Sequence, residues 1–133
     1  MESESSNERQ MRDVLVVEDD PEINKLVGAY VELAGFNYVG ALSGGDALAR
    51  VARNLPHAIV LDLMLPDISG FEVARRLKAE NVTNAVPVII LTALDSDASR
   101  IEAEQHGVVE YMTKPFDPER LLEALSKHAG SER

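Results

Sequence analysis

The chain reads Asp-Val-Leu-Val-Val-Glu-Asp-Asp-Pro over residues 13–21, and this stretch decides the fold. Four consecutive aliphatic residues are typical of a central strand that is buried on both faces of a parallel sheet. The acidic residues end the strand, and Asp20-Pro21 supplies an N-cap and a first-turn proline for a helix. Residues 13–21 therefore predict a strand, an acidic turn and the start of a covering helix.

The same alternation of strand and helix patterns continues to about Lys127. Strands are predicted at residues 14–17, 37–41, 58–61, 88–91 and 110–112, with the glycine-containing 37–41 at a sheet edge. Helices are predicted over residues 23–34, 46–53 and 71–78, from 95–97 to about 107, and after Asp117-Pro118. Crossovers are right-handed and helices must cover both faces of the sheet. The elements therefore predict one α/β domain, a doubly wound (βα)5 flavodoxin-like fold with a five-stranded parallel sheet in order 2-1-3-4-5.

Composition sets the broad class of the protein. Its 133 residues fit one domain, with residues 1–12 expected to be a disordered N-terminal tail and residues 128–133 a C-terminal tail or the start of a linker. A net charge of −10 opposes attraction to phosphate backbones, so we expect no direct nucleic-acid binding. The chain has no cysteine and no apolar stretch of membrane-spanning length, which favours a cytoplasmic protein that does not enter the membrane.

Polar residues follow four of the predicted strands. These residues are Glu18 and Asp19 after the first strand, Asp62 after the third, Thr92 after the fourth and Lys114 after the fifth. Ligands of doubly wound sheets bind outside the carboxyl ends of the strands, so we expect these side chains to converge on one pocket. Carboxylates gathered this closely repel one another unless they share a hard cation, which predicts a divalent metal site. Asp20 is interpreted as the helix cap and not as a metal ligand.

These motifs resemble the receiver domain of two-component response regulators, of the chemotaxis-regulator-like kind, over residues 13–127. Glu18 and Asp19 match the acidic pair of that family, and Asp62 matches its phosphoacceptor, with Pro66 four residues and Gly70 eight residues further on. The remaining matches are Thr92, which lies 30 residues after Asp62, Tyr111, a further 19 residues on, and Lys114-Pro115. Several spaced motifs carry the resemblance, which makes it far more specific than any one of them.

The resemblance implies a phosphorylation site. Asp62 would accept a phosphoryl group from a histidine kinase or a phosphotransfer protein. Mg²⁺, or Mn²⁺, would be held by Asp19, Asp62 and the backbone carbonyl of Met64, with Glu18 acting directly or through water. Such a domain is expected to be a signalling phosphoacceptor and not an enzyme, since at most it catalyses its own phosphorylation and dephosphorylation.

The resemblance also implies a switch. Thr92 and Lys114 would each bind a phosphoryl oxygen, and a cis peptide bond before Pro115 would aim the lysine inward. As Thr92 moves toward the phosphoryl group, it would vacate space for the ring of Tyr111, and the face made by the fourth helix, fifth strand and fifth helix would change. That face would control an unknown downstream protein or effector domain, and a phosphorylation-dependent homodimer through it stays open.

Other functions fit parts of the pattern. A phosphatase of the haloacid dehalogenase type also forms an aspartyl phosphate, but it requires a second aspartate at the position of Met64. A flavodoxin that carries FMN needs a phosphate-binding loop where this chain has three acidic residues. A degenerate receiver that acts as a phosphorylation-independent interaction module remains the alternative. Met64 and Leu94 are apolar where some receivers carry polar residues, so we expect slow intrinsic dephosphorylation.

Overall fold

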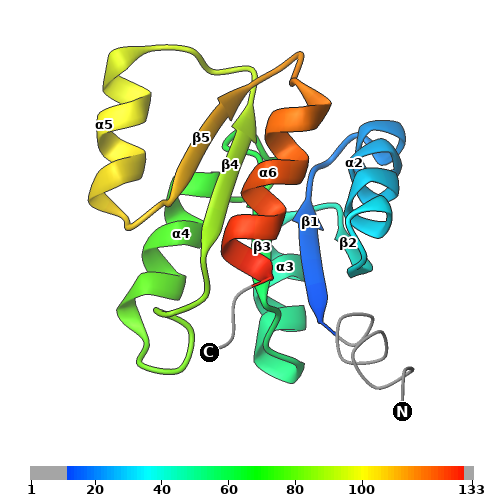
Figure 1. Cartoon of the computed structure of the whole chain (residues 1–133). Coiled ribbons are helices and arrows are strands. Elements are labelled where there is room, and N and C mark those ends of the chain that lie inside the picture. Colours follow the sequence, from blue (N-terminus) through cyan, green and yellow to red (C-terminus); the bar gives the residue numbers. More distant parts are fainter. Residues whose placement is uncertain (1–11, 131–133) are drawn as a thin grey trace.

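The computed structural model describes residues 12–130, so most of the tail expected at residues 1–12 and the last three residues of the tail expected at residues 128–133 lie outside the described residues. Within the described residues, five strands and five helices alternate along the chain (Figure 1). The strands are β1 (Asp13–Val17), β2 (Asn37–Ala41), β3 (Ala58–Leu61), β4 (Val88–Thr92) and β5 (Glu110–Thr113). The helices are α2 (Pro21–Leu33), α3 (Gly44–Arg53), α4 (Gly70–Ala79), α5 (Asp97–Gln105) and α6 (Pro118–Ala129). All pairings are parallel, and the order β2-β1-β3-β4-β5 confirms the predicted topology.

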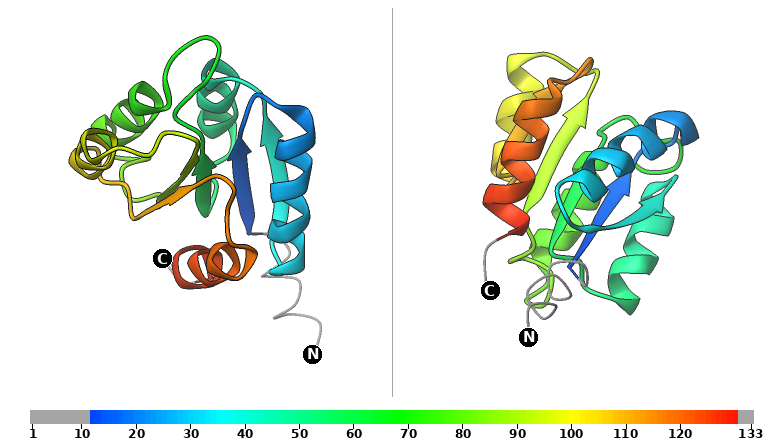
Figure 2. Two further views of the ribbon diagram at one scale, coloured as in Figure 1. Left: turned by 90° about the horizontal axis from the view of Figure 1, so that it is seen from above. Right: turned by 45° about the vertical axis from the view of Figure 1, so that its right-hand side comes forward.

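The sheet is covered on both faces, which explains the unbroken aliphatic runs. Helices α2 and α6 lie on one face, and α3, α4 and α5 lie on the other (Figure 2). Along β1, Val14 and Val16 pack toward α2 and α6, whereas Leu15 and Val17 pack into the core on the opposite face. A strand buried on both sides has no place for a polar residue until it leaves the sheet. In β1 and β3, the polar residues of the carboxyl ends therefore come only after the aliphatic run.

Each helix begins at a side chain that caps it. The caps are Asp20, Ser43, Ser69, Ser96 and Asp117, and each accepts a hydrogen bond from a backbone amide of its first turn. Asp20 accepts from the amides of Glu22 and Ile23, as the sequence predicted for a helix cap. A cap of this kind contributes about 1 kcal/mol. The five caps stand in the loops that leave the carboxyl ends of the strands, so they also fix the shape of those loops.

Packed residues extend past both expected tail boundaries. Arg12 was assigned to the N-terminal tail, but its guanidinium donates a hydrogen bond of 2.6 Å to the carbonyl of Gly130. The C-terminal tail was expected from residue 128, but α6 continues to Ala129, which is buried. His128 lies 3.1 Å from the carboxylate of Glu110. The apolar spacing of α6 runs one turn further than expected, so these residues complete the packing of the helix.

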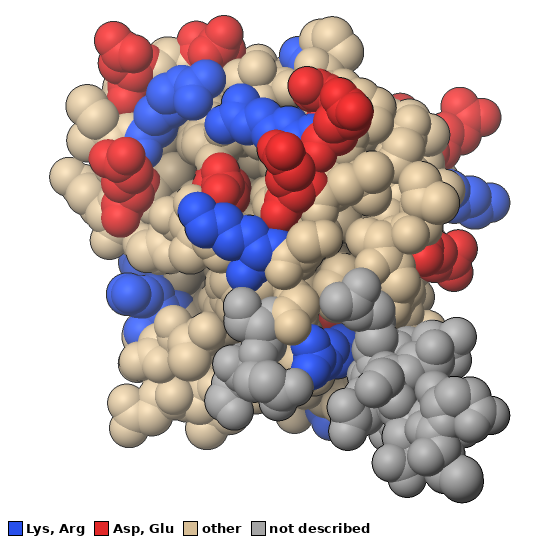
Figure 3. Space-filling view, viewed as in Figure 1, with Lys and Arg blue, Asp and Glu red and all other residues tan. Residues whose placement is uncertain are grey.

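Charges of both signs share the face that carries α6. Figure 3 shows Lys and Arg side chains standing among Asp and Glu side chains on this face instead of forming a patch of their own. Such mixing is typical of a solvated surface. Within residues 12–130, no helix combines the length and the apolar character that crossing a membrane requires.

Candidate functional site

Asp62 stands directly after β3 and is almost fully buried, with 4% of its surface exposed. Its amide continues the sheet by donating to the carbonyl of Val17 at 3.0 Å. One carboxylate oxygen accepts a hydrogen bond of 3.1 Å from the amide of Met64, and the other lies 2.9 Å from Nζ of Lys114. Since both oxygens are held, the carboxylate has a fixed orientation at the carboxyl edge of the sheet.

The acidic pair follows β1, the neighbouring strand. The amide of Glu18 donates to the carbonyl of Ala41 at 3.1 Å, and its carboxylate accepts from the amide of Asp20 at 2.9 Å. Glu18 is buried and Asp19 is exposed. The tight turn therefore directs one carboxylate into the protein and leaves the next one facing solvent.

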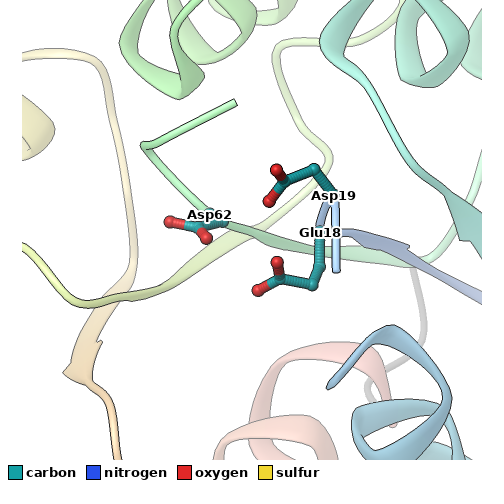
Figure 4. A group of neighbouring side chains, drawn as sticks. All are labelled: Glu18, Asp19 and Asp62. Carbon is teal, nitrogen blue, oxygen red and sulfur yellow. The ribbon is translucent and has the colours of Figure 1, made fainter. Parts of the chain in front are cut away.

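The three carboxylates of Glu18, Asp19 and Asp62 form one cluster. Figure 4 shows them pointing toward one another from β1 and β3, and one oxygen from each lies within 4.8 Å of the others. Burial raises the pKa of Glu18 above its usual 4.5, because lost solvation outweighs its hydrogen bond with Lys114. An all-oxygen set with one open side fits Mg²⁺, which keeps several waters and takes one or two carboxylates. The donor set therefore fits a hard divalent cation.

Lys114 joins the cluster from the end of β5. Its ammonium contacts the carboxylates of both Glu18 and Asp62. Burial alone would lower the pKa of Lys114, but the hydrogen bonds with the two carboxylates outweigh burial and raise it above 10.5. The peptide bond between Lys114 and Pro115 is cis, and the amide of Lys114 donates to the carbonyl of Thr92 at 2.8 Å. Lys114 is therefore a fixed positive charge beside Asp62.

Thr92 and Tyr111 lie on neighbouring strands beside this cluster. Thr92 is fully buried at the end of β4, and its hydroxyl accepts from the amide of Leu94 at 3.4 Å. The Tyr111 hydroxyl donates to the carbonyl of Leu94 at 2.9 Å, and the guanidinium of Arg100 lies 4.6 Å from the centre of the tyrosine ring. Burial raises the pKa of Tyr111, so the hydroxyl stays protonated as a donor. Tyr111 is thus linked to the loop that follows Thr92.

Helix α5 buries little apolar surface. Ala103 is its one buried residue, and Ile101 is 56% exposed. A helix with so little buried apolar surface is easier to displace than its neighbours. The contact of Arg100 with Tyr111 links the side chains of α5 and β5.

The structure brings together the residues that sequence analysis selected and adds others. Glu18, Asp19, Asp62 and Lys114 share one cluster, and Thr92 stands at the end of the adjacent strand. Sequence analysis missed Asn24, a buried residue of α2 that donates to the carbonyl of Glu18. The signal was a polar residue inside the buried stripe of α2, which the analysis passed over. The role of the Met64 carbonyl as a metal ligand stays a prediction, because Met64 contacts Asp62 through its backbone amide.

The fold and these residues define a receiver-type α/β domain, and comparisons with known proteins identify the family. The family model described as the response regulator receiver domain matches residues 14–126. The chain belongs to this family, which supports a phosphoacceptor role in two-component signalling and confirms the resemblance recognised in the sequence.

Individual relatives agree with this assignment. The chain is 39% identical over 109 residues to the DNA-binding dual master transcriptional regulator RpaA of Synechocystis, covering 82% of this chain and 45% of RpaA. It is 34% identical over 117 residues to the protein PilH of Pseudomonas aeruginosa, covering 87% of this chain and 96% of PilH. The crystal structure of a putative response regulator from Chloroflexus aurantiacus superposes with a TM-score of 0.85 at 28% identity, covering 91% of this chain and 99% of that one. The chain spans about half the length of several curated relatives it matches.

Proposed function

We propose that Asp62 accepts a phosphoryl group from a phosphohistidine of a histidine kinase or of a phosphotransfer protein. A carboxylate oxygen of Asp62 forms the new P–O bond while the N–P bond of the donor breaks, and the imidazole leaves with that electron pair. One observation carries the proposal. Asp62 is a buried carboxylate whose two oxygens are oriented by an amide and an ammonium, at the strand edge where its neighbours gather.

The cation that we propose for this site is Mg²⁺ or Mn²⁺. Glu18, Asp19 and Asp62 would hold it, because their oxygens lie close enough together to share one ion. The backbone carbonyl of Met64 is a further proposed ligand. When bound, the ion supplies positive charge that stabilises the phosphoryl oxygens during transfer. Members of the family usually bind Mg²⁺.

Lys114 and Thr92 are proposed to hold the transferred group. Lys114 already contacts Asp62, so its ammonium is in reach of an oxygen of a phosphoryl group attached there. The buried Thr92 hydroxyl has one described hydrogen bond, a long one that it accepts from the amide of Leu94. Its own O–H is therefore available to donate to a phosphoryl oxygen. The Lys114 ammonium would offset part of the negative charge of a buried aspartyl phosphate, and the Thr92 hydroxyl would stabilise it by a hydrogen bond.

Phosphorylation is proposed to act on the surface formed by α5, β5 and α6. Thr92 and Tyr111 are coupled through Leu94, and α5 has little buried surface to resist a shift. The altered surface would control a downstream protein or effector domain in the cytoplasm, or pair two phosphorylated copies. The domain would act as a signalling phosphoacceptor, with no catalysis beyond its own phosphorylation and dephosphorylation.

Intact-protein mass after incubation with acetyl phosphate tests the proposal. Wild type should gain one phosphoryl group with Mg²⁺ and none when the metal is chelated, and Asp62→Asn should gain none. Asp95→Asn is the matched control, because Asp95 is an exposed residue that pairs with Arg100 outside the carboxylate cluster. Failure of wild type to gain mass, together with failure to bind Mg²⁺, would support the degenerate receiver instead.

A further inference from the structure

Asn24 is a buried amide on the sheet-facing side of α2, with 2% of its surface exposed. Its Nδ2 lies within hydrogen-bonding distance of three backbone carbonyls, those of Glu18 and Ala41 at 2.9 Å and that of Val16 at 3.2 Å. Val16 is the penultimate residue of β1, Glu18 is the first residue after that strand, and Ala41 is the last residue of β2. Asn24 therefore ties the end of β1, from which the acidic pair leaves the sheet, to the end of the neighbouring strand β2.

The other end of the Asn24 amide is held by Tyr38 on β2. The Tyr38 hydroxyl donates a hydrogen bond to Oδ1 of Asn24. The ring reaches that position by lying against Gly28 of α2, where a β-carbon would come within 2.6 Å of it. Burial raises the pKa of Tyr38, so the phenol remains a donor. Both ends of the Asn24 amide are thus bonded, and its orientation is fixed.

We propose that Asn24 and Tyr38 are positioning residues for the carboxylates of the metal site, an inference that rests on the proposed function. The main chain of Glu18 is held at both its amide and its carbonyl, by Ala41 and by Asn24 respectively. The peptide between Glu18 and Asp19 is therefore fixed in direction.

Asp19 depends on that peptide more than its neighbours do. Its side chain is exposed, and within residues 12–130 its carboxylate accepts no hydrogen bond, whereas Glu18 and Asp62 are each held by Lys114. The direction of the Asp19 carboxylate is consequently set by its own backbone. Loosening the Glu18 carbonyl would let Asp19 swing out of the cluster while the rest of the site stays in place.

Direct Mn²⁺ binding, measured by titration with paramagnetic detection, tests the inference. Tyr38→Phe removes one hydroxyl and keeps the ring, and Asn24→Ser removes the amide. Groups that orient metal ligands typically change affinity by about 10–100-fold, so we expect about tenfold weaker binding for Asn24→Ser and a smaller loss of about threefold for Tyr38→Phe. Tyr30→Phe is the control, since the Tyr30 ring packs edge-on against Phe116 and its hydroxyl has no described hydrogen bond.

Two further readouts separate positioning from a loss of folding. All variants are compared at a temperature where circular dichroism shows each to be folded. Tyr38→Phe should need a higher Mn²⁺ concentration than wild type to reach half of its maximal rate of phosphorylation by acetyl phosphate. At saturating Mn²⁺, its rate should equal that of wild type.

The Mn²⁺ affinities and the saturating rates distinguish a failure of the positioning role from a failure of the metal site. Unchanged Mn²⁺ affinity in both variants, with wild type binding normally, would overturn the positioning role alone. Failure of wild type to bind Mn²⁺ would overturn the proposed metal site and this inference with it. A lower saturating rate with unchanged affinity would also contradict the inference, because it would place the defect in the transfer step.

Discussion

Replacing Gly70 by alanine is predicted to distort the proposed phosphorylation site through the backbone. A β-carbon at Gly70 would lie 2.3 Å from the carbonyl oxygen of Asp62 and 2.7 Å from Cα of Leu63, whereas real β-carbons stay beyond 3.0 Å. The difference between 2.3 and 3.0 Å means that the Asp62 backbone or the start of α4 must move by about 0.7 Å. Neither can yield as a flexible side chain would, because Asp62 continues β3 and Gly70 itself donates to the carbonyl of Leu63.

The size of the effect follows from that displacement. Overpacking typically costs about 1–3 kcal/mol of stability. Misplacing a reacting group by about 1 Å costs on the order of a hundredfold in rate, so a shift of this size should slow phosphorylation of Asp62 on the order of tenfold to a hundredfold. Urea unfolding measures the first effect, and the time course of intact mass with acetyl phosphate and Mg²⁺ measures the second.

Gly45→Ala is the matched control for Gly70→Ala. Both glycines lie in the first turn of a helix, but a β-carbon at Gly45 would meet only a carboxylate oxygen of Asp67 at 3.1 Å. Any gain from a less flexible unfolded chain is common to both variants. Equal stability and equal phosphorylation rates for the two variants would refute the argument that Gly70 is required by the close approach of Asp62.

Three further predictions concern charge, switching and lifetime. Glu72 is hydrogen-bonded by two arginines of α4, which lower its pKa from 4.5 to about 2. A carboxylate whose pKa is lower in the folded than in the unfolded protein stabilises the fold at pH values above the unfolded pKa, and this stability is lost as the pH falls. The urea midpoints of wild type and Glu72→Gln should therefore differ at neutral pH and converge toward pH about 2. Thr92→Ala removes the proposed hydrogen bond to the phosphoryl group, worth about 1.5–3 kcal/mol, so phosphorylation should slow. The Tyr111 ring signals in NMR spectra should then no longer shift on phosphorylation, whereas Thr92→Ser should behave as wild type. The phosphoryl adduct of wild type should outlast a few minutes in intact-mass decay curves and shorten in Met64→Asn; loss within seconds to a few minutes in wild type would contradict the expectation.

The sequence was sufficient for the fold and for most of the site because both follow from simple periodicity. Unbroken aliphatic runs such as those of β1 and β3 are typical of strands buried on both faces, and parallel strands bring their carboxyl ends to one edge. Glu18 and Asp62 therefore follow adjacent strands, β1 and β3, whereas Lys114 reaches Asp62 from β5, on the far side of β4. The family motifs then assigned a role to each.

The parts that sequence analysis missed depend on contacts across the fold. The bond between Tyr38 and Asn24 links an edge strand to a helix, and no spacing along the chain reveals which side chain reaches which. The same holds for Arg100 over the ring of Tyr111. The end of α6 was missed because Ala129 is a small residue, and its burial becomes evident only when the sheet beneath it is known.

Chemical mapping of the phosphorylated residue tests the central claim most directly. Borohydride reduces an aspartyl phosphate to homoserine, which peptide mass spectrometry locates to a single position. After treatment with acetyl phosphate and Mg²⁺, the account predicts homoserine at residue 62 and at no other aspartate. Homoserine at Asp19 or Asp67, or none in a sample whose intact mass has increased, would contradict the assignment of Asp62 as the phosphoacceptor.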